Sequence, residues 1–493
     1  MFEAAEVGSV VPKDEYKARV PLLRTELLEV QRELSRQARF PVVAVFAGVD
    51  GAGKSETVNL LNEWMDPRWI VTRAFGEPSE EEQEHPEYWR YWLGLPPRGR
   101  IGLFLSSWYS GPVLDRVHRR ASRARFDERL AEIAAFEKAL ADDGALILKF
   151  WMHLGRGEQK KRLKKLEQNP LTRWRVTRQQ WKHWRMYDDF VSAGEHAIER
   201  TSTADAPWTI VEGTDERYRS LTVSTVIRDA MRRRLAERTP AAAAGKRAMR
   251  VVASPARATI LGRLDMSKKM KHAVFEREIE KWQGRLNVLH RKAKDKGIAT
   301  ILAFEGWDAA GKGGAIRRVT AALEAPAYRV IPIAAPTDEE RAHHYLWRFW
   351  RQLPRDGRLT IFDRSWYGRV LVERVEGFAS PAEWLRAYSE INQFEQQLVD
   401  HGIVLVKYWL NITAEEQLRR FKERERLAFK QWKLTADDWR NRKKWKQYAQ
   451  AVNDMVERTS TRPAPWTLVE ANDKYFARIK VLKTVCARLE EAL

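Results

Sequence analysis

A glycine-rich segment that ends in lysine is the first place where this sequence could carry out chemistry. Gly306 and Gly311, with four residues between them, precede Lys312, after an apolar run at 299–304 and before a predicted helix. In that context the backbone N–H groups of the turn point at phosphate oxygens, and the lysine adds a positive charge. We predict a phosphate-binding loop here. The alternative, a glycine turn that only caps a helix, is disfavoured by the preceding strand and by a second copy.

An acidic side chain inside this loop indicates a metal ion. Asp308 lies between the two glycines, and Gly313 occupies the position where a magnesium-binding serine or threonine usually follows the lysine. A carboxylate among phosphates is repulsive unless a cation lies between them. We therefore predict that Asp308 is a metal ligand rather than a structural acid.

A second acid ends another predicted strand. Asp363 follows the apolar run 359–362 and precedes Arg364. In phosphate-loop enzymes an acid at the end of a neighbouring strand holds or orients magnesium, and arginine grips phosphoryl oxygens through its forked guanidinium. An aspartate that merely caps a helix would leave the adjacent arginine unexplained. Asp308 and Asp363 together predict a site for Mg²⁺ (or Mn²⁺).

The sequence contains an internal duplication. An offset of 258 residues places 46–54 on 304–312, and no gap is needed from 46 to 212. The same offset aligns Trp89-Arg90 with Trp347-Arg348, Ser107-Trp108-Tyr109 with Ser365-Trp366-Tyr367, and Pro207-Trp208 with Pro465-Trp466. We predict two similar domains, 1–238 and 258–493, joined by a linker at 239–257 that is rich in alanine and basic residues.

Strands and helices alternate within each repeat. Short apolar runs that are bounded by glycine suit buried parallel strands, and stretches of helical periodicity separate them. This alternation predicts tandem three-layer α/β/α phosphate-loop domains, each with a parallel sheet and a basic helical lid.

The two repeats differ where the chemistry should occur. The first repeat has Leu105 at the position of Asp363, Ser106 at that of Arg364 and Gly111 at that of Arg369. It keeps a glycine-rich loop but lacks the acid and two positive charges that a metal-bridged transfer site needs. We predict that 1–238 is non-catalytic and that 258–493 is catalytic.

Composition limits the class of protein. The chain has 493 residues, 44% of them hydrophobic and 31% charged, which excludes a disordered chain, and its net charge of +21 predicts a polyanionic partner. Cys486 is the one cysteine, so no disulfide framework forms. A start without a signal-peptide pattern and the lack of an 18-residue apolar stretch predict a cytoplasmic protein without a membrane partner. A homo-oligomer is left open.

The positive charge is concentrated in two segments. Residues 419–446 contain twelve basic and four acidic residues, and residues 160–185 contain ten and one. Solvated helical faces with core tryptophans would be the simpler interpretation. At the lid position of a phosphate-loop fold, however, so much charge suits a long polyanion. We expect the second repeat's lid to hold it through Arg424, Lys430, Lys433, Lys443 and Lys444.

The two motifs 306–314 and 363–369 resemble those of the family-2 polyphosphate kinases, and the chain is most similar to their fused two-domain class. The resemblance implies a three-layer phosphate-loop kinase fold, magnesium held by Asp308 and Asp363, and phosphate contacts from Lys312, Arg364 and Arg369. It also implies an active C-terminal half. The remaining residues expected at the phosphate or nucleotide site are Gly306, Ala309, Ala310, Gly311, Gly313, Gly314 and Arg348.

The function that follows is transfer of a phosphoryl group from inorganic polyphosphate to AMP, which gives ADP, with Asp308, Lys312, Asp363 and Arg364 as the catalytic set. The choice of AMP depends on the resemblance alone, so ADP or GDP as acceptor is an alternative. We expect the acceptor base near residues 337–348. A phosphate-loop protein that binds nucleic acid through its basic lids is an alternative from a different class. An ordinary ATP-dependent nucleoside monophosphate kinase would not need such charged lids.

Overall fold

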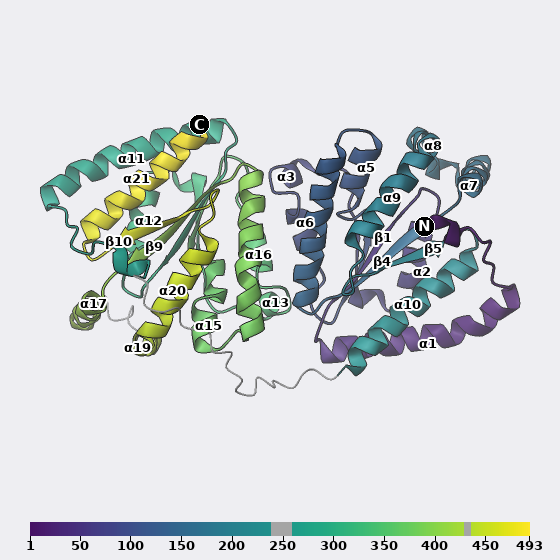
Figure 1. Ribbon diagram of the computed structural model, residues 1–493, viewed down its shortest axis with the longest axis horizontal. Coiled ribbons are helices and arrows are strands. Elements are labelled where there is room, and N and C mark those ends of the chain that lie inside the picture. Colours follow the sequence, from purple (N-terminus) through teal and green to yellow (C-terminus); the bar gives the residue numbers. More distant parts are fainter. Residues whose placement is uncertain (238–258, 428–434) are drawn as a thin grey trace. The chain divides into compact units, whose positions relative to one another are not determined.

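The computed structural model describes residues 1–237, 259–427 and 435–493 (Figure 1). The chain forms two compact units. Unit 1 comprises Met1–Pro78, Arg90–Ala241 and Asp338–His344, and unit 2 comprises Ser79–Trp89, Ala242–Thr337 and Tyr345–Leu493. Two short helices therefore group with the opposite repeat, α3 (Glu80–Gln83) with unit 2 and α13 (Asp338–Arg341) with unit 1. The predicted linker at 239–257 lies outside the described residues.

Unit 1 is built on a parallel five-stranded sheet with the strand order β2-β3-β1-β4-β5. The strands are β1 (Val42–Gly48), β2 (Ile70–Ala74), β3 (Ile101–Leu105), β4 (Leu146–His153) and β5 (Trp208–Glu212). β1 and β4 are almost continuously buried, as expected for central strands that are covered by helices on both faces.

Two groups of helices cover the sheet of unit 1 (Figure 1). One group contains α1 (Lys13–Gln37), α2 (Lys54–Trp64) and α10 (Glu216–Ala236). The other contains α5 (Ser110–Val117), α6 (Arg123–Asp142) and α9 (Tyr187–Thr201). α4 (Trp89–Gly94), α7 (Arg156–Gln168) and α8 (Arg178–Arg185) complete the helices of this repeat.

Unit 2 repeats this sheet with the order β10-β9-β6-β8-β7, again all parallel. The strands are β6 (Thr300–Gly306), β7 (Tyr328–Pro332), β8 (Leu359–Asp363), β9 (Val404–Asn411) and β10 (Trp466–Glu470). β6 pairs with β8 so that Phe304 lies opposite Asp363, and the corresponding pair in unit 1 is Phe46 and Leu105. The pairing register of these strands is therefore the same in both units when residues 258 positions apart are compared.

The helices of unit 2 again form two groups (Figure 1). α11 (His272–Asp295), α12 (Lys312–Thr320) and α21 (Lys474–Ala492) form one group, and α15 (Val372–Glu376), α16 (Pro381–Asp400) and α20 (Trp445–Thr459) form the other. α14 (Trp347–Trp350), α17 (Ala414–Arg426) and α19 (Ala436–Lys443) complete the described helices of this repeat. The predicted fold class, two tandem α/β domains with parallel sheets, is confirmed.

A buried ion pair joins a central strand to a covering helix at the equivalent position of each repeat. Lys407 Nζ on β9 lies 2.7 Å from Glu395 on α16, and Lys149 on β4 makes the same contact with Glu137 on α6. In unit 2, Tyr367 OH and Trp366 Nε1 donate to the same glutamate, so the segment after β8 is anchored to the core. Burial raises the pKa of Glu395 and lowers that of Lys407, so each group needs the other's charge to stay ionised in the core.

In the described ranges, no helix combines the length and the apolar character needed to cross a membrane.

Candidate active site

The glycine-rich turn of unit 2 (residues 306–312) connects the end of β6 to the start of α12. A Cβ atom on Gly306 would lie 2.6 Å from the carbonyl oxygen of Leu410, so only glycine allows the turn to pass this close to β9. Lys312 begins the helix, and its Nζ donates to the carbonyl oxygen of Gly306 at 2.8 Å. Ala309 has a φ of +64°, a left-handed conformation that is unusual for alanine.

Asp308 in this turn is held by side chains from three other elements. Its Oδ1 lies 3.2 Å from Arg364 Nη2, and its Oδ2 accepts a hydrogen bond from Asn441 Nδ2 at 2.9 Å. Gln417 Nε2 donates to its carbonyl oxygen at 3.1 Å. The structure thus brings together Asp308 and Arg364, as predicted, and adds Asn441 from α19 and Gln417 from α17.

Arg364 follows β8 directly and has a φ of +65°. Burial lowers the pKa of this guanidinium, but the carboxylates of Asp308, Glu305 and Asp363 outweigh burial and raise it. Asp438 of α19 acts in the same direction, so four carboxylates act on one arginine, three of them at the carboxyl ends of β6 and β8 or in the turn.

Glu305 is a member of this site that sequence reasoning missed. Its side chain is buried and accepts hydrogen bonds from the backbone N–H of Ser365 at 2.8 Å and from its hydroxyl at 2.9 Å. Burial raises the pKa of Glu305. The sequence does carry a signal for it, because the first repeat has Ala47 at this position.

The carboxylates fit a hard divalent cation. Among the described residues, no set of three or more His, Cys, Asp or Glu side chains is arranged to hold a metal ion. Mg²⁺ is commonly held by one or two carboxylates together with phosphate oxygens and water, and a cation at this site would take Asp308 and Asp363 as its protein ligands. The excess of carboxylates around Arg364 leaves negative charge for such a cation to neutralise.

Two cavities border the turn. The first, about 70 Å³, has the Asp308 and Arg364 side chains at its border and aromatic rings in its wall. Trp307 and Trp445 stack there with ring centroids 3.8 Å apart and an interplanar angle of 7°. The indole of Trp307 donates to Asn411 Oδ1 at 2.9 Å, which fixes the ring.

The second cavity, about 210 Å³, lies against residues 309–311 and is cationic, with four basic side chains and one acidic side chain, Glu423, in its lining. Its basic lining residues are Arg420, Arg424, Lys474 and Arg478. Burial lowers the pKa of Arg478, and the nearby guanidinium groups of Arg318, Arg317 and Arg420 lower it further. An anion in this cavity would relieve that repulsion. Lys474 and Arg478 were missed from the sequence, although the first repeat has Glu216 and Ser220 at their positions.

Arg420 joins the lid segment to the turn. Its guanidinium is buried and donates to the carbonyl oxygens of Ala309 at 2.9 Å, Ala310 at 3.0 Å and Ala471 at 2.7 Å. α17 is thereby connected both to the glycine-rich turn and to the end of β10.

The predicted lid residues separate into different groups. Arg424 lines the cationic cavity, and Lys443 is exposed on α19. Lys444 Nζ lies 2.8 Å from a carboxylate oxygen of Glu376, so this lysine is neutralised locally rather than held ready for a donor. The predicted residues Lys430 and Lys433 lie outside the described residues. Arg419 and Arg440 also pair with acids, so the net charge of 419–446 overstates the charge available to a ligand.

Arg369 and Arg348, which are predicted to contact phosphate or nucleotide, contact protein groups in this structure. Arg369 Nη1 lies 3.2 Å from Glu373 Oε2, and its guanidinium covers the ring of Tyr345 at 4.5 Å. Arg348 Nη1 donates to the carbonyl oxygen of Ala334 at 3.1 Å. Neither arginine is among the described residues that line the two cavities. Of the predicted glycines, Gly306, Gly311 and Gly314 border a cavity, whereas Gly313 is exposed.

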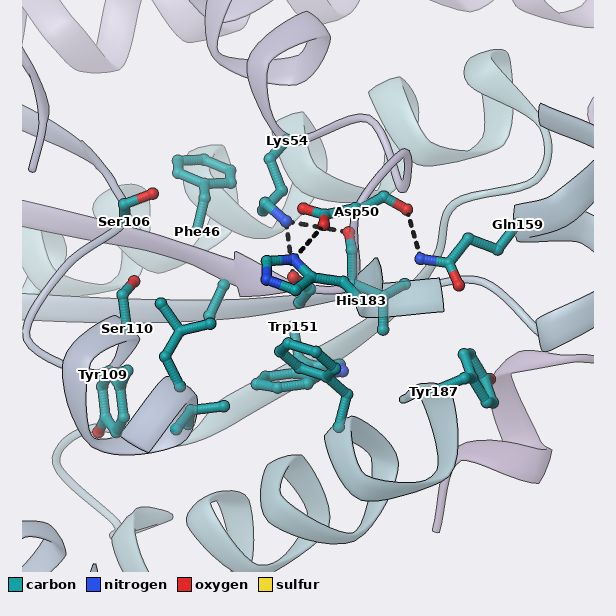
Figure 2. Close-up of a pocket in the computed structure, with 16 residues that line it drawn as sticks. Phe46, Asp50, Lys54, Ser106, Tyr109, Ser110, Trp151, Gln159, His183 and Tyr187 are labelled. Atoms are coloured by element: carbon teal, nitrogen blue, oxygen red, sulfur yellow. Dashed lines mark hydrogen bonds and ion pairs between the residues drawn. The ribbon is translucent and has the colours of Figure 1, made fainter. Parts of the chain in front are cut away.

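Unit 1 has its own cavity at the equivalent turn, of about 230 Å³ (Figure 2). Lys54 Nζ donates to the carbonyl oxygen of Gly48 at 2.6 Å, as Lys312 does with Gly306. Asp50 pairs with His183, whose Nδ1 is 2.8 Å away. Burial alone would raise the pKa of Asp50, but His183 and Lys54 lower it.

Comparison with known proteins identifies the fold and the repeat together. The family described as polyphosphate kinase 2 matches residues 10–239 and again residues 269–493. The chain belongs to the polyphosphate kinase 2 family. It is 51% identical over 492 residues to the polyphosphate:AMP phosphotransferase of Pseudomonas aeruginosa, which covers 100% of this chain and 99% of that protein.

One more relative and one solved structure of the polyphosphate kinase 2 family also match both repeats. The polyphosphate:AMP phosphotransferase of Acinetobacter johnsonii is 36% identical over 451 residues, 91% of each chain. A crystal structure described as polyphosphate kinase 2 from Pseudomonas aeruginosa PA01 superimposes with a TM-score of 0.90 at 50% identity, and covers 100% of this chain and 99% of that one. The tandem arrangement is therefore shared with full-length relatives.

Proposed function

We propose that this protein transfers a phosphoryl group from inorganic polyphosphate to AMP and so produces ADP. The observation that carries the proposal is the contact of Asp308 with Arg364 at the turn that precedes Lys312, together with the cavity rich in basic residues that borders the same turn. Relatives that match the chain over its whole length are named polyphosphate:AMP phosphotransferases, which supports AMP over ADP or GDP as acceptor.

The donor would occupy the cationic cavity. A polyphosphate chain is a dense line charge, and the side chains of Arg424, Lys474 and Arg478 would neutralise successive phosphates. The turn residues Ala309 and Ala310 border the same cavity, so the reacting end of the donor lies against the backbone of the turn.

The transfer itself needs positioning and charge neutralisation rather than covalent chemistry. Lys312 and Arg364 stabilise the negative charge that spreads over the oxygens of the transferring phosphoryl group. The acceptor phosphate approaches Arg364 from the first cavity, which Asp308 also borders. Asn441 and Gln417 hold Asp308 from the lid helices, so the acid and the lid are positioned together.

Asp308 and Asp363 would hold Mg²⁺ (or Mn²⁺). The ion supplies charge neutralisation on phosphoryl oxygens when it is bound. Until then, Arg364 and Asn441 satisfy the Asp308 carboxylate.

The test is turnover by the purified full-length chain with polyphosphate as the sole phosphoryl donor. We expect ADP from AMP with added Mg²⁺, little ATP from ADP, and no product in EDTA. AMP, ADP, GMP and GDP are compared by kcat/KM. A higher kcat/KM for ADP than for AMP would contradict the proposed acceptor, and binding of nucleic acid without any turnover would contradict the enzyme itself.

We also propose a cytoplasmic location. It is supported by Cys486, the one cysteine of the sequence, which is buried and free of any disulfide.

A further inference from the structure

The cavity of unit 1 corresponds residue by residue to the first cavity of unit 2. All thirteen residues that line the unit 2 cavity have a counterpart 258 positions earlier that lines the unit 1 cavity. In unit 1, Phe46, Lys54 and Tyr109 join the lining. The duplication has thus preserved a cavity, and not only a fold, in the repeat that lacks the catalytic set.

This cavity is wider because small side chains replace large ones. Ala47 occupies the position of Glu305, Val49 that of Trp307, and Ser106 that of Arg364. The volume is about 230 Å³ in unit 1 against about 70 Å³ in unit 2. The backbone is unchanged at the most constrained of these positions, since φ is +49° at Ser106 and +65° at Arg364.

The charges of the wider cavity do not suit a metal-bound polyanion. Leu105 replaces Asp363, and Asp50 is already paired with His183 at 2.8 Å. Burial lowers the pKa of Lys54, and the nearby Asp50 carboxylate opposes this shift. At the position of Ala477, which lines the cationic cavity of unit 2, unit 1 has Arg219, whose buried guanidinium donates to the Thr57 hydroxyl at 3.1 Å and to the carbonyl oxygen of Gly213 at 3.0 Å.

The walls instead suit a planar aromatic molecule with hydrogen-bonding groups. Trp151, Tyr187 and Phe190 supply aromatic surface, and Ser106 and Ser110 supply hydroxyls. Figure 2 shows Lys54, Asp50 and His183 pointing toward one another at one side of the cavity, and the two serines at another. Apolar walls with a few convergent polar groups are typical of small-ligand sites.

We propose that unit 1 binds a purine nucleoside moiety, as the free nucleoside or as its monophosphate, without a divalent cation. The aromatic walls take the base, and the serine hydroxyls and Lys54 take the polar groups of the sugar or the phosphate. The choice of a purine nucleoside rests on the proposed function, since AMP is the acceptor proposed for the equivalent cavity of unit 2.

The experiment is calorimetric titration of the full-length chain with adenosine and, separately, with AMP, both in EDTA. We expect saturable binding of at least one probe. Stronger binding of AMP that falls to the level of adenosine in Lys54→Ala would assign the phosphate to Lys54, and equal binding would assign recognition to the nucleoside alone.

Variants place the site in unit 1. Ser106→Arg introduces the side chain that unit 2 carries in the same left-handed conformation, and we expect it to weaken binding by at least about tenfold by filling the cavity. Ala124→Arg, which adds the same charge at an exposed position of α6, should leave binding unchanged. Val49→Trp, which introduces the residue that unit 2 carries as Trp307, is a second filling variant for use if Ser106→Arg does not fold.

Two outcomes would overturn the inference: no binding of either probe at millimolar concentration, or equal binding by the wild type and a folded filling variant. Turnover of AMP with polyphosphate is measured separately on the wild type. Turnover without binding in EDTA refutes this site and leaves the proposed function intact. Binding without turnover refutes the proposed function and leaves the site.

Discussion

The glycine-rich turns of the two units share their backbone and differ in the side chains around it. Lys54 and Lys312 begin equivalent helices and donate to equivalent carbonyl oxygens. Around Lys312 the carboxylates of Glu305, Asp308 and Asp363 act on Arg364, whereas unit 1 keeps only Asp50 of these acids. The duplication has therefore kept the backbone of the turn, while the charged groups at the ends of the neighbouring strands have diverged.

A second contrast concerns one buried guanidinium beside each turn. In unit 2, Arg420 reaches the turn from α17, and a cationic cavity remains between α17 and α21. In unit 1, the buried Arg219 of α10 donates to the carbonyl oxygen of Gly213, and Arg162, at the position of Arg420, lies 3.7 Å from Glu56. The two turns are therefore held by different arginine contacts.

The largest expected effect tests what the two units have in common. Lys407→Met and Lys149→Met should each destabilise the protein by about 3–5 kcal/mol, because each leaves a buried glutamate without its cation. Urea denaturation measures the loss. Lys138→Met, which breaks an exposed pair with Asp142, should cost at most about 1 kcal/mol. A large loss at Lys407 with none at Lys149 would show that the repeats are not built alike.

The next prediction tests the difference between the units. Asp363→Asn and Lys312→Ala should each lower kcat at least ~10²-fold, since both groups act on the charge of the transition state. The matched variant Lys54→Ala should stay within roughly threefold of the wild type, because the surrounding acids and arginine are missing from unit 1. Initial rates with AMP and polyphosphate provide the measurement. Equal losses at Lys54 and Lys312 would refute a non-catalytic first unit.

A smaller effect is expected from the cationic cavity. Ser220 is the residue of unit 1 at the position of Arg478. Arg478→Ser should raise KM for polyphosphate about tenfold, because it removes one charged contact. It should also flatten the dependence of KM on salt concentration. Lys483→Ser, exposed on the same helix, is the control and should leave KM unchanged. If KM for AMP rises instead, the cavity holds the acceptor and not the donor.

The smallest effect concerns the lid. Lys443→Ala should raise KM for long polyphosphate by about two- to threefold and leave KM for AMP unchanged, as expected for an exposed charge. Lys444→Ala should act mainly on stability, because Lys444 neutralises Glu376. KM is measured with a short and a long polyphosphate. If Lys443→Ala has the same effect with both lengths, Lys443 does not contact the distal part of the donor.

The sequence predicted the features that depend on local pattern. The strands β6 and β8, the turn at 306–312 and the proximity of Asp308 to Arg364 follow from apolar runs that end in polar residues at one edge of a parallel sheet. The offset of 258 residues also predicted which repeat lacks the acids.

The features that it did not predict depend on packing between distant segments. Arg478 belongs to a C-terminal helix of ordinary composition, and only tertiary packing brings it beside Arg420. Lys444 was expected to face the donor, but Glu376, nearly seventy residues earlier, takes up its charge. A count of charges along the chain cannot reveal such pairing, because it records neither partner nor burial.

The left-handed alanine in the turn of unit 2 has a consequence for conformational entropy. Ala309 occupies a position where unit 1 has Gly51, with φ values of +64° and +78°. Alanine is strained there by about 1 kcal/mol, yet it removes many of the backbone conformations that a glycine would sample in the unfolded chain and in an open turn. Unit 2 thus carries a stiffer glycine-rich turn than unit 1, and a ligand that binds at the turn of unit 2 has less backbone to order.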